Sequence, residues 1–272
     1  MASRFGDFRV VKPLIEGGTA TIYLAENNAH GRVAVKVLRK ADARARRALA
    51  REYRLLSRLE HPSLLKVYAF GTSPQPYLAM EYFPGPSIRL WLRRDPGAVR
   101  RKVCAILEGA GAALGCMHAQ GVVHGDVKPE NLLLSEKGEV RLIDLSTAST
   151  PWARRLRLAG RRVGTVGYLA PEVAAGAVAH VGSDVYALGA TAYELLTDQA
   201  PFMGGSREST IKRQTRGTVT APSRLRSGVP QAVDAILLRM LAPYPSARPV
   251  DAALAARQLN KALEGAPLGG EE

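Results

Sequence analysis

The sequence predicts an α+β protein in which a small strand-rich lobe precedes a larger, mainly helical lobe. Strands are predicted within 8–38, where apolar residues alternate at 33–38, and at 64–70 and 77–82, whereas helical periodicity prevails beyond Ser87. Between them, Phe83-Pro84-Gly85-Pro86 interrupts both patterns and marks a domain boundary. The 272 residues include 46% hydrophobic and 23% charged residues, an ordinary globular composition that excludes wholesale disorder.

The strand-rich lobe is predicted from residues 8–38, 64–70 and 77–82. Residues 33–38 read Val-Ala-Val-Lys-Val-Leu, and this period of two is typical of a strand with two distinct faces. Lys36 is a charged residue in this otherwise apolar strand, where an unpaired charge would be unfavourable. It therefore needs an anionic partner, and the alternative is a strand-edge lysine whose ammonium group reaches the solvent.

A helix is expected from Asp42 to Leu59, with Asp42 as its N-cap and His61-Pro62 at its end. One face of it carries Leu49, Glu52, Leu55, Leu56 and Leu59. A row beside that face, spaced by three and four residues, consists of Arg44, Arg47, Arg51, Arg54 and Arg58. This row is either a solvated surface or a docking surface for an acidic partner.

The larger lobe begins with a helix whose apolar stripe consists of Val103, Ile106, Leu107, Ala110, Leu114 and Met117. Further helical patterns recur at 183–197, 230–241 and 250–263. The cysteines Cys104 and Cys116 both fall on the first helix, about 18 Å apart. A disulfide needs Cα atoms within about 7 Å, so these two thiols are expected to stay free.

The charge balance is strongly basic, with 38 Lys and Arg against 24 Asp and Glu and a net charge of +14. The charge is spread along the chain, which disfavours nucleic acid as a partner, since nucleic-acid binding needs a concentrated patch. A positive surface does suit an anionic substrate such as a nucleotide. The sequence has no leader-like apolar run at its start and no stretch of the ~20 apolar residues of a membrane helix, so a cytoplasmic protein without a membrane segment is expected.

Two short segments carry the chemistry. Residues 122–134 read Val-Val-His-Gly-Asp-Val-Lys-Pro-Glu-Asn-Leu-Leu-Leu, and thirteen residues after Asn131 comes Asp144 in Arg-Leu-Ile-Asp-Leu-Ser. Five further motifs occur in the chain, and together with these two segments they follow the order found in one protein family. They are Val-Ala-Val-Lys at 33–36, Glu52, Gly-Thr-Val-Gly-Tyr-Leu-Ala-Pro-Glu at 164–172, Ser-Asp-Val-Tyr-Ala-Leu-Gly at 183–189, and Arg248-Pro249. Together these motifs resemble the eukaryotic-like (bacterial Hanks-type) serine/threonine protein kinase family over residues 8–263.

The resemblance implies a bilobal protein kinase-like fold, with a kinase domain at 1–265 and a short tail at 266–272. Within it, the N-lobe is expected at 1–82, the hinge at 81–86 and the C-lobe at 87–265. The implied reaction transfers the γ-phosphate of ATP to a serine or threonine hydroxyl of a protein substrate. The implied ion is Mg²⁺, with Mn²⁺ as the alternative.

The resemblance also implies the roles of individual residues. Phosphoryl transfer depends mostly on positioning and on neutralising the charge of the polyphosphate. Asp126 would accept the proton of the attacking hydroxyl, and Lys128 would counter charge on the transferred group. Asn131 and Asp144 would supply oxygen ligands to the metal ion. Lys36 would pair with Glu52 and with the α- and β-phosphates of ATP.

Other positions are implied to contact ATP or to support the site. The small side chain of Ala34 leaves room for a flat base. The remaining ATP positions are Gly17, Gly18, Ile22, Met80 as the gatekeeper, and the backbone of Glu81 and Phe83. Glu172 and Arg248 would form a buried ion pair, Asp184 would hold the catalytic-loop backbone, and Thr165 would contact the base and lysine of that loop.

Three departures from the family pattern stand out. The glycine-rich loop retains only Gly17 of its three glycines, with Gly18 beside it. Gly125 replaces an arginine that usually receives a phosphorylated loop residue, which puts activation by loop phosphorylation in doubt. Leu145 and Ser146 replace Phe and Gly, and the Cβ of Ser146 disfavours positive φ, so the switching of this segment is expected to change.

Two alternatives remain open beside an active protein kinase. A pseudokinase acting as a binding module fits the degraded glycine loop and Ser146, but not the retained Lys36, Glu52, Asp126, Asn131 and Asp144. A small-molecule kinase resembling aminoglycoside phosphotransferases fits the His-Gly-Asp form at 124–126. Those enzymes lack the 164–172 segment and the partner arginine at 248, so the protein kinase is favoured.

Overall fold

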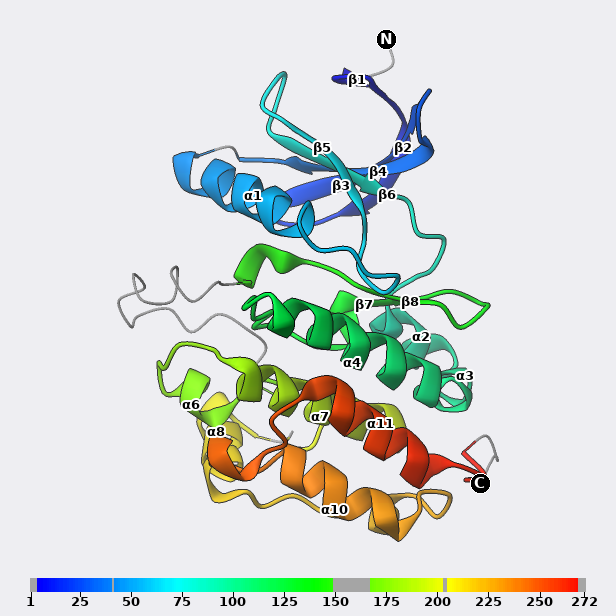
Figure 1. Cartoon of the computed structure of the whole chain (residues 1–272), viewed down its shortest axis with the longest axis vertical. Coiled ribbons are helices and arrows are strands. Elements are labelled where there is room, and N and C mark those ends of the chain that lie inside the picture. The colour runs from blue at the N-terminus through cyan, green and yellow to red at the C-terminus, as the bar shows by residue number, and fades with distance from the viewer. Residues whose placement is uncertain (1–3, 41, 149–166, 203–204, 269–272) are drawn as a thin grey trace. The chain divides into compact units, whose positions relative to one another are not determined.

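The computed structural model describes residues 4–40, 42–148, 167–202 and 205–268. The chain divides into two compact units. The first comprises Met1–Pro84 with Ile143–Ser146, and the second comprises Gly85–Leu142 with Thr147–Glu272. The first contains a sheet and one helix and the second is mainly helical (Figure 1), which confirms the predicted α+β class.

The first unit is built on a six-stranded antiparallel sheet with strand order β1-β2-β3-β4-β6-β5. The strands are β1 (Arg4–Phe5), β2 (Phe8–Glu16), β3 (Ala20–Asn27), β4 (Gly31–Leu38), β5 (Val67–Gly71) and β6 (Tyr77–Glu81). The predicted strands are confirmed, except that β5 begins at Val67 rather than at residue 64. The backbone N–H of Leu64 donates to the carbonyl of His61 in a turn, so the chain becomes extended only afterwards.

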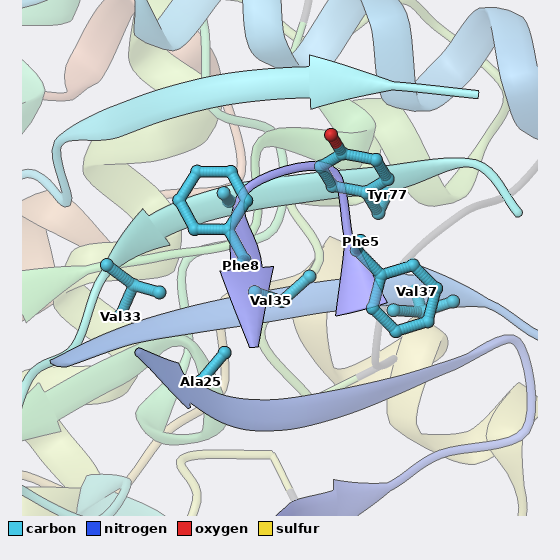
Figure 2. Close-up of a cluster of buried hydrophobic side chains, with 8 residues drawn as sticks. Phe5, Phe8, Ala25, Val33, Val35, Val37 and Tyr77 are labelled. Carbon is cyan, nitrogen blue, oxygen red and sulfur yellow. The ribbon is translucent and has the colours of Figure 1, made fainter. Parts of the chain in front are cut away.

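The alternation of β4 gives the sheet two different faces. Val33, Val35 and Val37 pack with Phe5, Phe8 and Tyr77 in a buried cluster (Figure 2). This aromatic cover comes from the chain's first two strands and from β6.

The opposite face of the sheet carries Ala34 and Lys36. Residues directly opposite one another in a ladder share a face, and the register pairs Ala34 with Met80 and Lys36 with Leu78 and Ile22. The candidate nucleotide-binding side chains of β3, β4 and β6 therefore share one side of the sheet.

Helix α1 (Ala43–Leu56) packs against β5 and β6, and its N-cap is Asp42 as predicted. The Asp42 carboxylate accepts a hydrogen bond of 2.7 Å from the backbone N–H of Ala45. The helix ends at Leu56, before the predicted stop at His61-Pro62. The backbone tightens there into i→i+3 hydrogen bonds, from Arg58 to Leu55 and from Leu59 to Leu56, so the prediction of a helix up to Leu59 is wrong.

The second unit contains most of the helices. They are α2 (Ile88–Arg94), α3 (Pro96–Arg101), α4 (Val103–Ala119), α6 (Pro171–Ala174), α7 (Val181–Thr197), α8 (Arg207–Arg216), α9 (Pro222–Leu225), α10 (Gln231–Met240) and α11 (Ala252–Leu263). A hairpin of β7 (Leu132–Leu134) and β8 (Val140–Leu142) follows the short 3-10 helix Pro129–Asn131.

The core of the second unit forms around α4 and α7. Every residue of the predicted α4 stripe is fully buried, and α7 is buried along nearly its whole length. Cys104 and Cys116 lie on α4 and are not joined in a disulfide, as predicted. Within the described part of the chain, no helix is both long and apolar enough to cross a membrane.

Candidate active site

The loop before the β7–β8 hairpin brings Asp126, Lys128 and Asn131 together. The Asp126 carboxylate Oδ2 accepts hydrogen bonds from Lys128 Nζ at 2.7 Å and from Asn131 Nδ2 at 3.0 Å. Asn131 Nδ2 also donates to the Asp126 carbonyl at 2.8 Å, which orients its amide oxygen away from Asp126. The loop therefore presents a carboxylate, an ammonium group and an amide oxygen within a few ångströms of one another.

Asp184 at the start of α7 anchors this loop through its backbone. Its two carboxylate oxygens accept hydrogen bonds from the N–H groups of His124 at 2.9 Å and Gly125 at 2.8 Å. His118 Nε2 lies 2.8 Å from Asp184 Oδ2 as a third contact. Because Asp184 is completely buried, these contacts satisfy a carboxylate that water cannot reach. The position of Asp184 matches the support role expected from the sequence.

Gly125 has a backbone reason to be glycine. Its φ is +80°, a conformation that costs a residue with a Cβ about 1–2 kcal/mol. A Cβ built there would lie 3.6 Å from the Thr147 carbonyl oxygen, an ordinary contact, so the preference is conformational rather than steric. The loop geometry thus accounts for glycine at this position without reference to regulation.

In the first unit, Lys36 connects α1 with the segment that carries Asp144. Its Nζ lies 3.0 and 2.9 Å from the two carboxylate oxygens of Glu52 and 3.5 Å from Asp144 Oδ1. Burial alone would lower the pKa of Lys36, but the negative charges of Glu52 and Asp144 outweigh it and raise the pKa above its ordinary value. Lys36 is therefore a firmly protonated cation, and the strand-edge alternative is excluded.

Asp144 adopts a left-handed backbone conformation with φ of +65°, which for a non-glycine residue stores strain. Its Oδ1 accepts a hydrogen bond from the backbone N–H of Ser146 at 3.3 Å. Arg51 of α1 donates from Nη2 to the Ser146 carbonyl at 3.2 Å. Ser146 itself has no positive φ, so its Cβ carries no conformational penalty in this structure. The strain lies on Asp144.

Glu172 and Arg248 form the bidentate ion pair expected from the sequence. Arg248 Nη1 and Nη2 each lie 2.8 Å from a carboxylate oxygen of Glu172. The remaining guanidinium N–H groups donate to the carbonyls of Ala242, Gly182 and Pro243, and the group lies over the ring of Tyr186. Burial alone would raise the pKa of Glu172, but hydrogen bonds from Arg248 and His180 hold it well below its ordinary value.

Comparison with known families gives a match to the protein kinase domain over residues 8–261. The chain belongs to the protein kinase family. Curated relatives of this chain include serine/threonine-protein kinase PknB of Mycolicibacterium smegmatis, which is 34% identical over 92% of this chain and 42% of the relative. PknE of Mycobacterium tuberculosis is 33% identical over 90% of this chain and 44% of the relative, and PrkC of Bacillus subtilis is 31% identical over 88% and 38%. The chain spans less than half the length of these relatives. They confirm the family inferred from the motifs.

The glycine-rich loop contains one glycine at a tight backbone contact. The N–H of Gly17 donates to the Ala20 carbonyl at 3.0 Å, which closes a tight turn between β2 and β3. A Cβ at Gly17 would lie 3.1 Å from that same carbonyl oxygen, whereas a Cβ at Gly18 would meet nothing within 4 Å. The degraded motif therefore keeps a glycine at the position of the turn where a side chain would fit least easily.

At the predicted hinge, the structure limits which backbone groups could meet a base. Met80 is buried, and the N–H of Glu81 already donates to the Lys66 carbonyl at 2.8 Å. Glu81 can therefore offer only its carbonyl to adenine. Phe83 is buried as well. Thr165 lies outside the described residues.

The structure also reveals a cluster around Arg89 that the sequence analysis missed. Arg89 of α2 lies 2.8 Å from a carboxylate oxygen of Glu130 and 2.6 Å from one of Glu194, and Tyr168 also hydrogen-bonds to Glu194. Burial raises the pKa of Tyr168, and Glu194 raises it further. No sequence signal identifies this cluster, because Arg89 and Glu194 are 105 residues apart.

Arg89→Met is expected to lower the free energy of unfolding by about 2 kcal/mol. The substitution removes the hydrogen-bond donor shared by the carboxylates of Glu130 and Glu194, and Glu194 is buried. Chemical denaturation of the variant beside wild type measures the effect. Arg94→Met, at an exposed position of the same helix, is the matched control and is expected to change little. A free energy of unfolding equal to that of wild type would show that the cluster around Arg89 does not stabilise the fold.

Proposed function

We propose that this chain is an ATP- and Mg²⁺-dependent serine/threonine protein kinase domain that transfers the γ-phosphate of ATP to a protein hydroxyl. The observation that carries the proposal is the loop in which Lys128 and Asn131 hold the Asp126 carboxylate while Asp184 anchors the backbone. The three relatives named above, all serine/threonine-protein kinases, support the same reaction.

Asp126 acts as the base. Both hydrogen bonds to its carboxylate from described residues end on Oδ2, so Oδ1 is the oxygen that would accept the proton of the incoming hydroxyl. Lys128 holds the carboxylate in place and adds a positive charge that offsets charge on the transferred phosphoryl group.

Asn131 and Asp144 are the proposed ligands of Mg²⁺. The hydrogen bonds of Asn131 Nδ2 to Asp126 turn the amide oxygen of Asn131 outward. The Asp144 side chain is 39% exposed and presents a carboxylate beside Lys36. Hard oxygen donors of this kind fit Mg²⁺ and also Mn²⁺. When bound, the ion would neutralise charge on the β- and γ-phosphates.

The ATP side of the site rests on Lys36. Its ammonium group, held by Glu52, is a fixed positive charge suited to the α- and β-phosphates. Ala34, Ile22 and Met80 share its face of the sheet and would contact the base, with the carbonyl of Glu81 and the backbone of Phe83 as hydrogen-bonding groups. Gly17 and Gly18 would let the loop approach the phosphates.

The proposed partners are ATP, a protein with a serine or threonine acceptor, and an acidic protein at the arginine row of α1. We propose that the domain acts in the cytoplasm, where ATP is available and where Cys104 and Cys116 would stay reduced.

Incubation of the purified chain with labelled ATP, Mg²⁺ and generic acidic and basic proteins, and in a parallel reaction with an aminoglycoside, tests the function directly. Label on seryl or threonyl residues is the expected result. Nucleotide binding without turnover would favour a pseudokinase, and label on an aminoglycoside but not on protein would favour a small-molecule kinase.

Glu52→Gln is expected to lower kcat/KM for ATP by about 10²-fold, because it removes the charge that positions Lys36 toward the phosphates. Steady-state kinetics at varied ATP measures the effect. Glu60→Gln, an exposed change just beyond α1, serves as the control. Unchanged kinetics in Glu52→Gln would show that Lys36 does not need this partner.

A further inference from the structure

The exposed side of α1 carries a row of arginines whose place in the fold differs from the one predicted. Because α1 ends at Leu56, Arg58 lies beyond the helix, and the arginine face of α1 consists of Arg44, Arg47, Arg51 and Arg54. At 3.6 residues per turn these four point within about 80° of one another, and from Arg44 to Arg54 they span about 15 Å. Arg44, Arg47 and Arg54 are exposed, and Arg51 is half-buried.

The exposed arginines of this face lack acidic partners in the described part of the chain. Among the described residues, Arg44, Arg47 and Arg54 form no salt bridge. The only carboxylate on α1 is that of Glu52, which is 4% exposed and forms an ion pair with Lys36. The face is therefore a positive surface that the described residues do not neutralise.

The pattern is also unfavourable for an isolated helix. Like charges at i, i+3 and i, i+4 repel one another along the whole row. Arg44 additionally places positive charge in the first turn of α1, where the helix dipole favours negative charge and where the Asp42 N-cap is the acidic group at hand. An anionic partner would remove both disadvantages at once.

One residue connects this face to the candidate site. Arg51 belongs to the face and donates to the Ser146 carbonyl, two residues after Asp144. The neighbouring Glu52 holds Lys36. A partner bound along the face would therefore contact the helix that positions both Lys36 and the Asp144 segment.

We propose that the arginine face of α1 is a docking surface for an acidic segment of a protein partner. Guanidinium groups bind carboxylates in bidentate geometry, and a span of about 15 Å suits an extended acidic segment of about five residues. The face carries no aromatic side chain on which bases could stack and no large apolar side chain that could enter a bilayer. These features favour a polypeptide over nucleic acid or membrane. The proposal concerns binding alone and does not depend on the proposed phosphoryl transfer.

The test measures binding without ATP. A fluorescein-labelled peptide of alternating Glu and Gly is titrated with wild type and with the triple variant Arg44→Glu, Arg47→Glu, Arg54→Glu, which leaves Arg51 in place. The matched control reverses three exposed arginines of the second unit, Arg93→Glu, Arg94→Glu and Arg257→Glu, and so changes the net charge equally.

We expect the peptide to bind wild type and the control variant with Kd values within about twofold, and the triple variant at least about tenfold more weakly. The triple variant should unfold at about the same denaturant concentration as wild type, because negative charge at position 44 in the first turn is favourable and offsets the unfavourable negative charge at position 54 in the last turn. Lost binding would then not reflect unfolding. Equal binding by the triple variant, equal weakening in the control, or stronger binding of a DNA duplex or phosphatidylserine vesicles than of the peptide would overturn the proposal.

Discussion

Asp126→Asn is expected to lower kcat for protein phosphorylation by about 10²–10⁴-fold, the range that a positioned general base contributes. An asparagine at this position has nearly the same shape, and its amide oxygen can still accept the hydrogen bonds from Lys128 and Asn131. It cannot take a proton from the attacking hydroxyl. The loss should therefore appear in turnover, measured as label transfer at saturating ATP, while nucleotide affinity stays close to that of wild type.

The matched control for this variant is Asp251→Asn. Asp251 is exposed and caps α11 through a hydrogen bond from the N–H of Leu254, a role that asparagine fills equally well. Full activity is expected from the control. Wild-type turnover in Asp126→Asn would eliminate Asp126 as the base.

Arg248→Met is expected to lower the free energy of unfolding by about 3–5 kcal/mol, because removing one partner of a buried ion pair leaves the other charge uncompensated. Arg248 is 2% exposed, and its loss also leaves the carbonyls of Ala242, Gly182 and Pro243 without their donor. Denaturant-induced unfolding of both proteins measures the difference. Adding Glu172→Gln should restore part of the stability, because the variant then buries no unpaired charge.

The same pair predicts how stability depends on pH. The pKa of Glu172 is lower in the folded chain than in the unfolded chain, so the ionised pair stabilises the fold fully above about pH 4.3. The contribution is lost as the pH falls from there through the folded pKa. Wild type should therefore lose stability in acid more steeply than the double variant Arg248→Met, Glu172→Gln. A single Arg248→Met variant as stable as wild type would show that the pair contributes little.

Local patterns in the sequence were sufficient to predict several of the strands and longer helices. The alternation at 33–38 identified β4, because successive side chains of a strand point to opposite faces of the sheet and these two faces have different surroundings. Asp42 identified the start of α1, because a side-chain oxygen there satisfies a helix N–H locally. The motif spacing around Asp126, Asn131 and Asp144 identified the family, which the match over 8–261 confirms.

Interactions between distant segments were decided only by the tertiary structure. The sequence could not show that Arg89 joins Glu130 and Glu194, that Arg51 holds the Ser146 carbonyl, or that Asp144 rather than Ser146 carries the backbone strain. It also placed the end of α1 at a proline, whereas the chain leaves the helix earlier through tighter hydrogen bonds. Short-range periodicity and capping depend on neighbouring residues and are visible in sequence. The pairing of buried charges depends on which elements pack together, and only the folded chain brings those residues into contact.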